Sequence, residues 1–454
     1  MRLRRTLLKM ATPAPTATER PSSSQRSRFR DVVRSLRHRN FQLFFSGQLI
    51  SLIGTWMQTI AQAWLVYRIT GSSLLLGVVG FAGQIPIFIL SPVGGLAADR
   101  WNRHRIVIAT QVASMVLALI LAALTLFHVV KTWEIIVLAA LLGAVNAFDI
   151  PGRQSFLIEM VVREDLMNAI ALNSSMFNGA RVIGPAIAGI LVSRIGEGWC
   201  FFANGVSYIA VIVGLLMMKL PRHYPVPAGT SPFEHIAEGF RYIQRTGPIL
   251  ALITLIGIVS LVAVPYSVLM PIFADRVLHR GAHGLGILMG AAGVGALLGA
   301  LTLASRRGVK GLGGVVGYSA MAFGISLILY SLSKVFWLSV LLLVPVGYGV
   351  MLQMSSSNTL IQAMVPDQLR GRAMAMYTMM FMGMAPIGSL LSGVFADWIG
   401  APWTVAIGGA GAVAGAIHFL RRLPSLRFEA HQLLDAQGLA ATETSEGVAA
   451  RGVS

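Results

Sequence analysis

Three charged side chains lie inside long apolar stretches of the chain, where ionised groups are rare. Asp149 and Arg153 are four residues apart, so a helix places them on one face. Arg181 lies inside the next apolar stretch. Each of these charges costs at least a few kcal/mol if it faces lipid, so a mutual ion pair or a water-filled cavity is expected. Asp149 is either a proton carrier during a transport cycle or the structural partner of Arg153, and the sequence leaves both interpretations open.

The elements that must position these charges are membrane-spanning helices. The 454 residues are 55% apolar and only 12% charged, against about 25% charged in an ordinary soluble domain. The apolar residues form blocks that can cross a hydrocarbon core of about 30 Å at about 1.5 Å per residue. The single cysteine, Cys200, excludes an intramolecular disulfide. We therefore predict an all-α membrane protein with twelve transmembrane helices, at residues 41–69, 73–98, 106–130, 133–158, 167–193, 199–219, 248–273, 285–304, 313–333, 336–357, 374–396 and 402–420.

The twelve predicted helices divide into two halves that repeat each other. Residues 155–177 (SFLIEMVVREDLMNAIALNSSMF) match residues 358–380 (NTLIQAMVPDQLRGRAMAMYTMM) at the same stage of the second half. Few identities are involved, and convergence on a helix–loop–helix pattern is the alternative to an ancestral duplication. Two six-helix bundles related by duplication are a transporter architecture, with the substrate site between them.

The domain boundaries follow from this repeat. The bundles are predicted at 41–219 and 248–420, joined by a linker at 220–247 in which apolar residues at helical spacing indicate an amphipathic surface helix. The basic arm at 1–40 and the tail at 421–454 are expected to be disordered.

The basic residues favour one orientation in the membrane. With both termini and the linker in the cytoplasm, 28 of the 36 Lys and Arg residues lie on that side and six lie on the other, as the positive-inside rule requires. The net charge of +18 therefore reflects topology, and no nucleic acid partner is expected. We predict a multi-pass protein of a bacterial plasma (inner) membrane.

Several motifs resemble those of the Major Facilitator Superfamily. The segment GGLAADRWNRHR (94–105) resembles the superfamily's loop signature between its second and third helices, with Asn102 where a glycine is usual. The segment GARVIGPAIAG (179–189) is similar to the Gly-Pro signature of the superfamily's antiporters, with Ala188 where a glycine is common. The branch that contains exporters of enterobactin, macrolides and multiple drugs is similar in three further segments, at 40–77, 149–157 and 365–377.

The resemblance implies a latch that closes the cytoplasmic gate, formed by Gly95, Asp99, Arg100, Arg103 and Arg105. A carboxylate at a helix end can accept hydrogen bonds from a neighbouring helix terminus and pair with an arginine in one orientation of the halves only. The alternative is that these charges only fix the topology.

The Gly-Pro motif implies an antiporter hinge that seals against leak, formed by Gly179, Gly184, Pro185 and Gly189. Small residues also let helices approach closely, and proline bends a helix. Plain helix packing is therefore the alternative.

The resemblance also implies a central cavity lined by the first, fourth, seventh and tenth helices. Neutral amides and aromatic rings there suit an uncharged or delocalised amphipathic substrate, although each side chain could instead form a hydrogen bond between helices. The candidates on these helices are Thr55, Gln58, Gln62, Asn146, Ser260, Tyr266, Tyr348, Gln353 and Asn358.

The predicted function is secondary active export of a siderophore, drug or metabolite by alternating access, with protons as the coupling ion. An importer or facilitator of the same fold is the alternative, and the duplication does not favour a membrane receptor. The sequence contains no phosphate-binding loop, no HExxH and no GxSxG motif, which argues against a primary pump and an intramembrane enzyme. The expected partners are the small-molecule substrate, protons and the bilayer, with no cofactor or metal, and the protein is expected to be a monomer.

Overall fold

The computed structural model describes residues 34–218, 241, 243–306 and 308–436. Within them, twelve helices are long and apolar enough to cross a membrane, and each predicted span has its counterpart. The first six are α2 (Arg39–Thr70), α3 (Ser73–Arg100), α4 (Arg103–Leu126), α5 (Thr132–Leu157), α6 (Leu166–Ile195) and α7 (Glu197–Leu216). The short helices η1 (Arg34–Arg37) and η2 (Arg163–Asp165) precede α2 and α6.

The second half begins with an interrupted span, in which an α-helix passes through 3-10 and π turns. Its pieces are α9 (Gly247–Val262), η3 (Val264–Leu269), α10 (Met270–Ile272) and η4 (Phe273–Val277). Pro265 and Pro271 lie within these pieces, and proline removes a backbone donor from a helix. The remaining spans are α11 (Gly281–Ala304), α12 (Leu312–Leu332), α13 (Phe336–Met364), α14 (Asp367–Ile399) and α15 (Ala401–Ala436).

The two halves contain the same pattern of helix contacts. In the first half, α2 packs on α6 and α7, α4 packs on α5 and α7, and α3 packs on α5. In the second half, α9 packs on α14 and α15, α12 packs on α13 and α15, and α11 packs on α13. Each contact of the second set is a contact of the first set moved six spans along the chain. The predicted pair of six-helix bundles related by duplication is thus confirmed.

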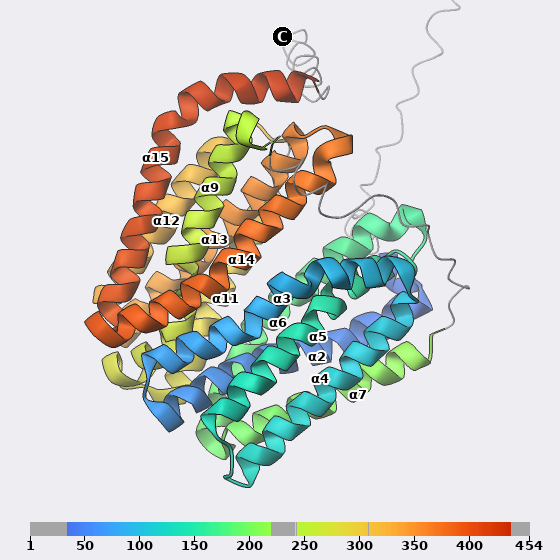
Figure 1. The fold of residues 1–454 in the computed structure, drawn as a ribbon, viewed down its shortest axis with the longest axis vertical. Helices are drawn as coiled ribbons and strands as arrows, with labels where there is room; N and C mark the ends of the chain where they lie inside the picture. The colour runs from blue at the N-terminus through green and yellow to red at the C-terminus, as the bar shows by residue number, and fades with distance from the viewer. Residues whose placement is uncertain (1–33, 219–240, 242, 307, 437–454) are drawn as a thin grey trace, which may run out of the picture.

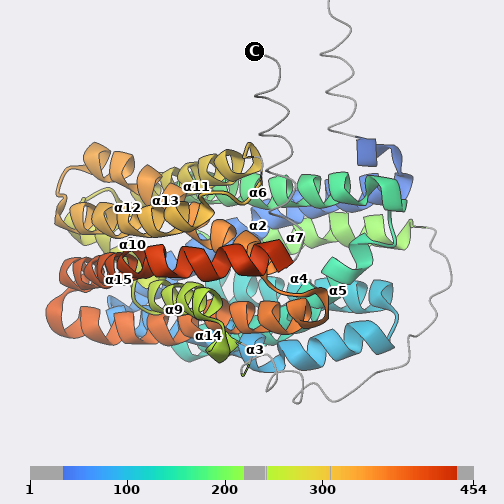
Figure 2. The same cartoon turned by 90° about the horizontal axis from the view of Figure 1, so that it is seen from above.

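The halves contact each other mainly through two helix pairs, α3 with α14 and α6 with α11. We call the end of the molecule where α2 begins and α15 ends the terminal end, and the other the opposite end. In Figure 1 the bundles lie closest together at the lower left, the opposite end, and diverge toward the terminal end. The halves are also distinct, side by side, in Figure 2.

Facing glycines bring these helix pairs together near the opposite end. A Cβ atom on Gly189 of α6 would lie 2.9 Å from the Gly286 Cα atom of α11. A Cβ atom on Gly77 of α3 would likewise lie 2.9 Å from the Gly393 Cα atom of α14. Backbones that approach this closely leave no room for a side chain, so glycine is required at these crossings.

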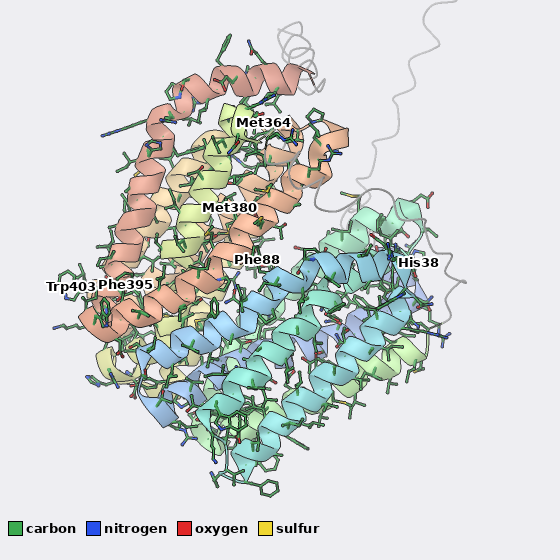
Figure 3. The ribbon with its side chains drawn as sticks, viewed as in Figure 1. His38, Phe88, Met364, Met380, Phe395 and Trp403 are labelled. Carbon is green, nitrogen blue, oxygen red and sulfur yellow. The ribbon has the colours of Figure 1, made fainter. Side chains whose placement is uncertain are left out.

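The ring of Phe88 fills the space between α3 and α14 further toward the terminal end (Figure 3), where a Cβ atom on Gly383 would lie 2.6 Å from it.

The chain at both termini is more ordered than the sequence suggested. Helix α15 continues to Ala436 instead of ending at 420, and Figure 1 shows it bending across the terminal end. Pro424 lies at the bend, as expected for a kinked helix. Beyond it, Leu426, Ala430 and Leu433 pack against the core at helical spacing, so the extension is amphipathic.

The end of the basic arm, from Arg34 onward, is held against the loop before α6. Arg34 and His38 both bind the Asp165 carboxylate, the latter at 2.8 Å, and the Ser35 hydroxyl donates to the Asp165 carbonyl. The hydrogen bond from His38 is the main reason that the pKa of Asp165 is lowered. Most of the predicted linker helix, and the rest of the arm and tail, lie outside the described residues. At its end Arg241 and residues 243–245 are helical, and Ile243 is buried in the core.

The glycines of the predicted hinge have different surroundings. A Cβ atom on Gly184 would lie 2.9 Å from the Ile53 carbonyl oxygen of α2, while one on Gly179 would contact nothing within 4 Å. The motif therefore contains two packing positions, Gly184 within the first half and Gly189 between the halves, and one open position.

We predict that Gly189→Ala and Gly184→Ala lower the stability of the protein while Gly179→Ala does not. Overpacking a tight helix crossing costs about 1–3 kcal/mol, whereas Ala for Gly at an open helical position favours the helix by about 1 kcal/mol. Thermal unfolding of the three purified variants in detergent measures the difference. Equal losses for all three variants would contradict the assignment of the packing positions.

Candidate functional site

A cavity of about 740 Å³ lies between the two halves. Its lining comes from α2, α3, α5 and α6 in the first half and from η3, α11, α13 and α14 in the second. The four spans implied by the resemblance are among them, and α3, α6, α11 and α14 also contribute because they form the contact between the halves.

Four of the predicted binding residues line this cavity: Thr55, Gln62, Asn146 and Tyr266. Other polar and aromatic lining residues were not predicted: those on α3, α6 and α14 because only four spans were considered, and two serines although their spans, the seventh and tenth, were considered. An isolated polar residue in an apolar helix, such as Gln84, was a usable signal. The missed residues include Gln84, Asn178, Ser267, Ser355, Tyr377 and Phe381.

The other predicted binding residues lie elsewhere. Gln58 is buried between α2 and α7, where it accepts a hydrogen bond of 2.6 Å from Asn204. It shares a helix with Thr55 and Gln62 but faces the bundle interior, because α2 packs on α7 along that side. Its proposed role in the cavity is thereby corrected to an interhelical hydrogen bond.

On α13, Tyr348, Gln353 and Asn358 are also absent from the cavity lining. Tyr348 packs against α11, where a Cβ atom on Gly295 would lie 2.8 Å from its backbone nitrogen, and Asn358 accepts a hydrogen bond from Gln362 one turn away. Gln353 and Ser260 are fully buried, and their side-chain polar atoms have no hydrogen-bond partner among the described residues.

Among the described residues, Arg181 is the one charged side chain in the cavity lining. Its guanidinium carbon lies 5.6 Å from the centre of the Trp56 ring, within the range of a cation–π contact. Phe177, one turn earlier on α6, meets the same ring edge-on at 5.7 Å. Two aromatic rings and an arginine from α2 and α6 thus form one wall of the cavity.

Asp149 and Arg153 are brought together as predicted, but away from this cavity. The Asp149 carboxylate is 3% exposed and accepts hydrogen bonds from Thr110 at 2.8 Å and Gln111 at 2.9 Å, both on α4. Arg153 pairs with it at 3.1 Å. Three donors thus satisfy the hydrogen-bonding capacity of the buried carboxylate.

The predicted latch residues lie at the terminal end without a contact between the halves. Asp99 is exposed and makes no hydrogen bond or ion pair with another described residue, and Arg100 and Arg105 are also exposed. Arg103 donates to the Ala98 carbonyl at 3.1 Å and to Glu159 at 3.1 Å, both within the first half.

The two adjacent glycines at the start of this segment have different surroundings. A Cβ atom on Gly95 would contact nothing within 4 Å, whereas one on Gly94 would collide with the Ala147 carbonyl of α5. The close approach of α3 to α5 therefore depends on Gly94.

The halves are hydrogen-bonded at the opposite end, by residues that the sequence analysis had not selected. The Tyr67 hydroxyl of α2 donates to Asp275 at 2.7 Å, and Arg276 donates to the Gly71 carbonyl at 2.9 Å. The Arg276 guanidinium also lies 5.6 Å from the Tyr67 ring centre. The π turn η4 carries both Asp275 and Arg276.

Comparison with known proteins gives a consistent result. A family model described as transmembrane secretion effector matches residues 32–450. The staphyloferrin A transporter of Staphylococcus aureus is 27% identical over 85% of this chain and 97% of its own length. The enterobactin exporter EntS of Citrobacter koseri is 24% identical over 86% of this chain and 93% of its own length. A solved structure of the nucleoside transporter NupG has the same fold, with a TM-score of 0.65 at 14% identity over 86% of this chain and 99% of that one.

We predict that Tyr67→Phe loosens the contact between the halves at the opposite end. A hydrogen bond to a charged group contributes about 1.5–3 kcal/mol. The equilibrium constant for separation of the two halves at the opposite end should therefore rise about tenfold or more. Spin labels on Ile69→Cys and Trp403→Cys in a Cys200→Ser background report this as a larger population at long distances. Tyr318→Phe, at an exposed site on α12, is the control. An unchanged distance distribution in Tyr67→Phe would show that the hydroxyl does not hold this end closed.

Proposed function

Because the chain belongs to the transmembrane secretion effector family of the Major Facilitator Superfamily, we propose that it exports amphipathic small molecules by alternating access. Its fold and its relatives are those of membrane transporters. The observation that carries the proposal is the cavity of about 740 Å³ between two pseudo-symmetric halves that are joined at one end. Binding sites at a repeat interface are typical of secondary transporters.

The arrangement of the halves supports an inward-facing state. The positive-inside rule places the terminal end in the cytoplasm, and the contacts between Tyr67, Gly71, Asp275 and Arg276 then close the outer end. The exposed carboxylate of Asp99, which has no partner in the described part of the chain, is consistent with a latch that forms only when the halves close at the cytoplasmic end. The contacts of α3 with α14 and of α6 with α11 provide the surfaces about which the two halves rotate relative to each other.

The names of the relatives support export but do not identify the molecule that this protein transports. The two relatives compared above are named for staphyloferrin A and enterobactin, so a siderophore, a drug or a metabolite of amphipathic character is the proposed cargo. The mixed lining of aromatic rings, methionines and neutral polar groups suits such a molecule. Import or facilitated diffusion by the same fold is the competing proposal.

Protons are the proposed coupling ion. A proton entering as the substrate leaves supplies the energy for uphill export without a nucleotide-binding site. Asp149 was the carrier suggested by the sequence, but its three hydrogen-bond donors and its distance from the cavity lining favour a structural pair with Arg153.

The direction of transport is tested in inside-out membrane vesicles energised by respiration. With dansylglycine and dansylglycinamide as amphipathic probes, vesicles that contain the protein should accumulate at least one probe, and nigericin with valinomycin should abolish the accumulation by collapsing both the pH gradient and the membrane potential. Accumulation that persists without the gradient would refute proton coupling. Net movement in the other direction would establish import.

The latch is tested in the same vesicles. Asp99→Asn should reduce accumulation strongly without reducing the amount of protein in the membrane, because it removes a charge at similar size. Near-normal accumulation would reject the latch.

We predict that Asp149→Asn lowers the yield of folded protein, because an uncompensated buried cation costs about 3–5 kcal/mol. The double variant Asp149→Asn with Arg153→Gln leaves no unpaired charge, so it should recover both folding and gradient-driven accumulation. Size-exclusion profiles and vesicle uptake measure the two properties. A double variant that folds and exchanges probe, yet fails to accumulate it, would identify Asp149 as the proton carrier.

A further inference from the structure

Arg181 and Arg153 differ in how their charges are balanced, although both lie on spans of the same half. Arg153 has a carboxylate partner at 3.1 Å. Arg181 forms no ion pair with a described residue, and its recorded partner is the face of the Trp56 ring. A ring face attracts a cation but carries no net charge, so the Arg181 charge is left without a neutralising anion.

Three carboxylates of the surrounding spans are engaged elsewhere, and two more, Asp99 and Asp397, are exposed at helix ends and absent from the cavity lining. Asp149 binds Arg153, Glu197 binds Arg68 at 2.7 Å, and Asp275 accepts the Tyr67 hydroxyl. None of the 34 lining residues in the described part of the chain is acidic. The cavity is therefore a site with a formal charge of one positive unit in a region of low dielectric constant.

An unneutralised arginine at membrane depth is costly, and such residues mark substrate pathways. Because Arg181 is half-buried and lines the cavity, water hydrates it when the cavity is empty. The field of a single positive charge in a cavity with apolar walls attracts anions and disfavours cations. The planar guanidinium also presents paired donors that match a carboxylate.

The location of Arg181 links an anion to the movement of the halves. Its backbone lies against α11, where a Cβ atom on Gly293 would be 2.9 Å from the Arg181 carbonyl oxygen. Tyr266 and Ser267 of η3 line the same cavity from the second half. An anion on Arg181 would therefore lie where α6 contacts α11, in a cavity that both halves line.

We propose that Arg181 is the recognition group for an amphipathic organic anion, with Trp56 and Phe177 contacting its apolar part. The inference rests on the proposed function, because it assigns the substrate class of the same cavity. It replaces the uncharged molecule that the neutral lining residues suggested. The chemistry is that of a carboxylate or similar anion attached to an aromatic or aliphatic body.

The test uses two probes that differ only in charge. Dansylglycine carries a carboxylate that is ionised at neutral pH, and dansylglycinamide carries a neutral amide in its place. Their fluorescence is titrated with the full-length protein in nanodiscs of neutral lipid. The wild-type protein should bind the carboxylate about tenfold or more tightly than the amide, as expected for a charge-assisted hydrogen bond.

Variants assign this preference to one side chain. Arg181→Gln should abolish the preference without weakening amide binding, which also shows that the cavity is still folded. Arg181→Lys should retain part of the preference. Arg194→Gln is the matched control, because it removes the same charge from an exposed position on the same helix and should leave the preference intact.

Three results would overturn the inference: no preference in the wild-type protein, a preference that survives in Arg181→Gln, or failure of both probes to bind. Displacement of dansylglycine by added phosphatidylglycerol would assign Arg181 to a lipid headgroup and also overturn the substrate assignment. Failure of the proposed function would give a different result from failure of this inference. Dansylglycine would still bind with an Arg181-dependent preference, but it would not accumulate in energised vesicles.

Discussion

The contact of α3 with α14 and of α6 with α11 is the constraint on which the rest of the structure depends. At Gly77, Gly189, Gly286 and Gly393 the backbones approach so closely that a Cβ atom would not fit. In the six-span repeat α3 corresponds to α11 and α6 corresponds to α14, so the α3–α14 contact is equivalent to the α11–α6 contact. The two halves therefore meet through equivalent surfaces. Joining the halves near one end leaves the cavity between them, and the hydrogen bonds from Tyr67 and Arg276 hold that end together. The cavity and its closure therefore have the same physical origin.

Charge is distributed according to the cost of burying it. Inside the first bundle, where the Asp149 carboxylate is buried, Asp149 and Arg153 neutralise each other and Thr110 and Gln111 complete the hydrogen bonding. In the cavity, where water and substrate can enter, Arg181 has only a ring face beside it. A buried pair gives a rigid, neutral bundle, whereas a single hydrated charge gives a site with a preference among ligands. Arginine thus has a structural role at position 153 and, in our proposal, a recognition role at position 181.

Much of the fold could be predicted because a bilayer imposes one simple requirement on the chain. Each span must satisfy its backbone hydrogen bonds internally and present apolar side chains, so hydropathy alone locates helices such as α4 and α12. The boundaries were less accurate where amphipathic structure adjoins a span. The extension of α15 past Pro424 was missed because its apolar residues, Leu426 and Leu433, are separated by charged ones and do not form a continuous block.

The sequence by itself determined the twelve spans and the presence of three charges within them, and its repeat and motifs predicted the duplication and the family. Only the tertiary structure decided which face of each helix meets the cavity. Gln58 and Gln62 are one turn apart on α2, yet Gln58 bonds Asn204 inside the bundle while Gln62 lines the cavity. Asp149 and Arg181 had equal standing as candidates until packing placed one against α4 and the other beside Trp56. The physical reason is that hydropathy depends on the residues of one helix, whereas the environment of a polar side chain depends on which neighbouring helix covers it.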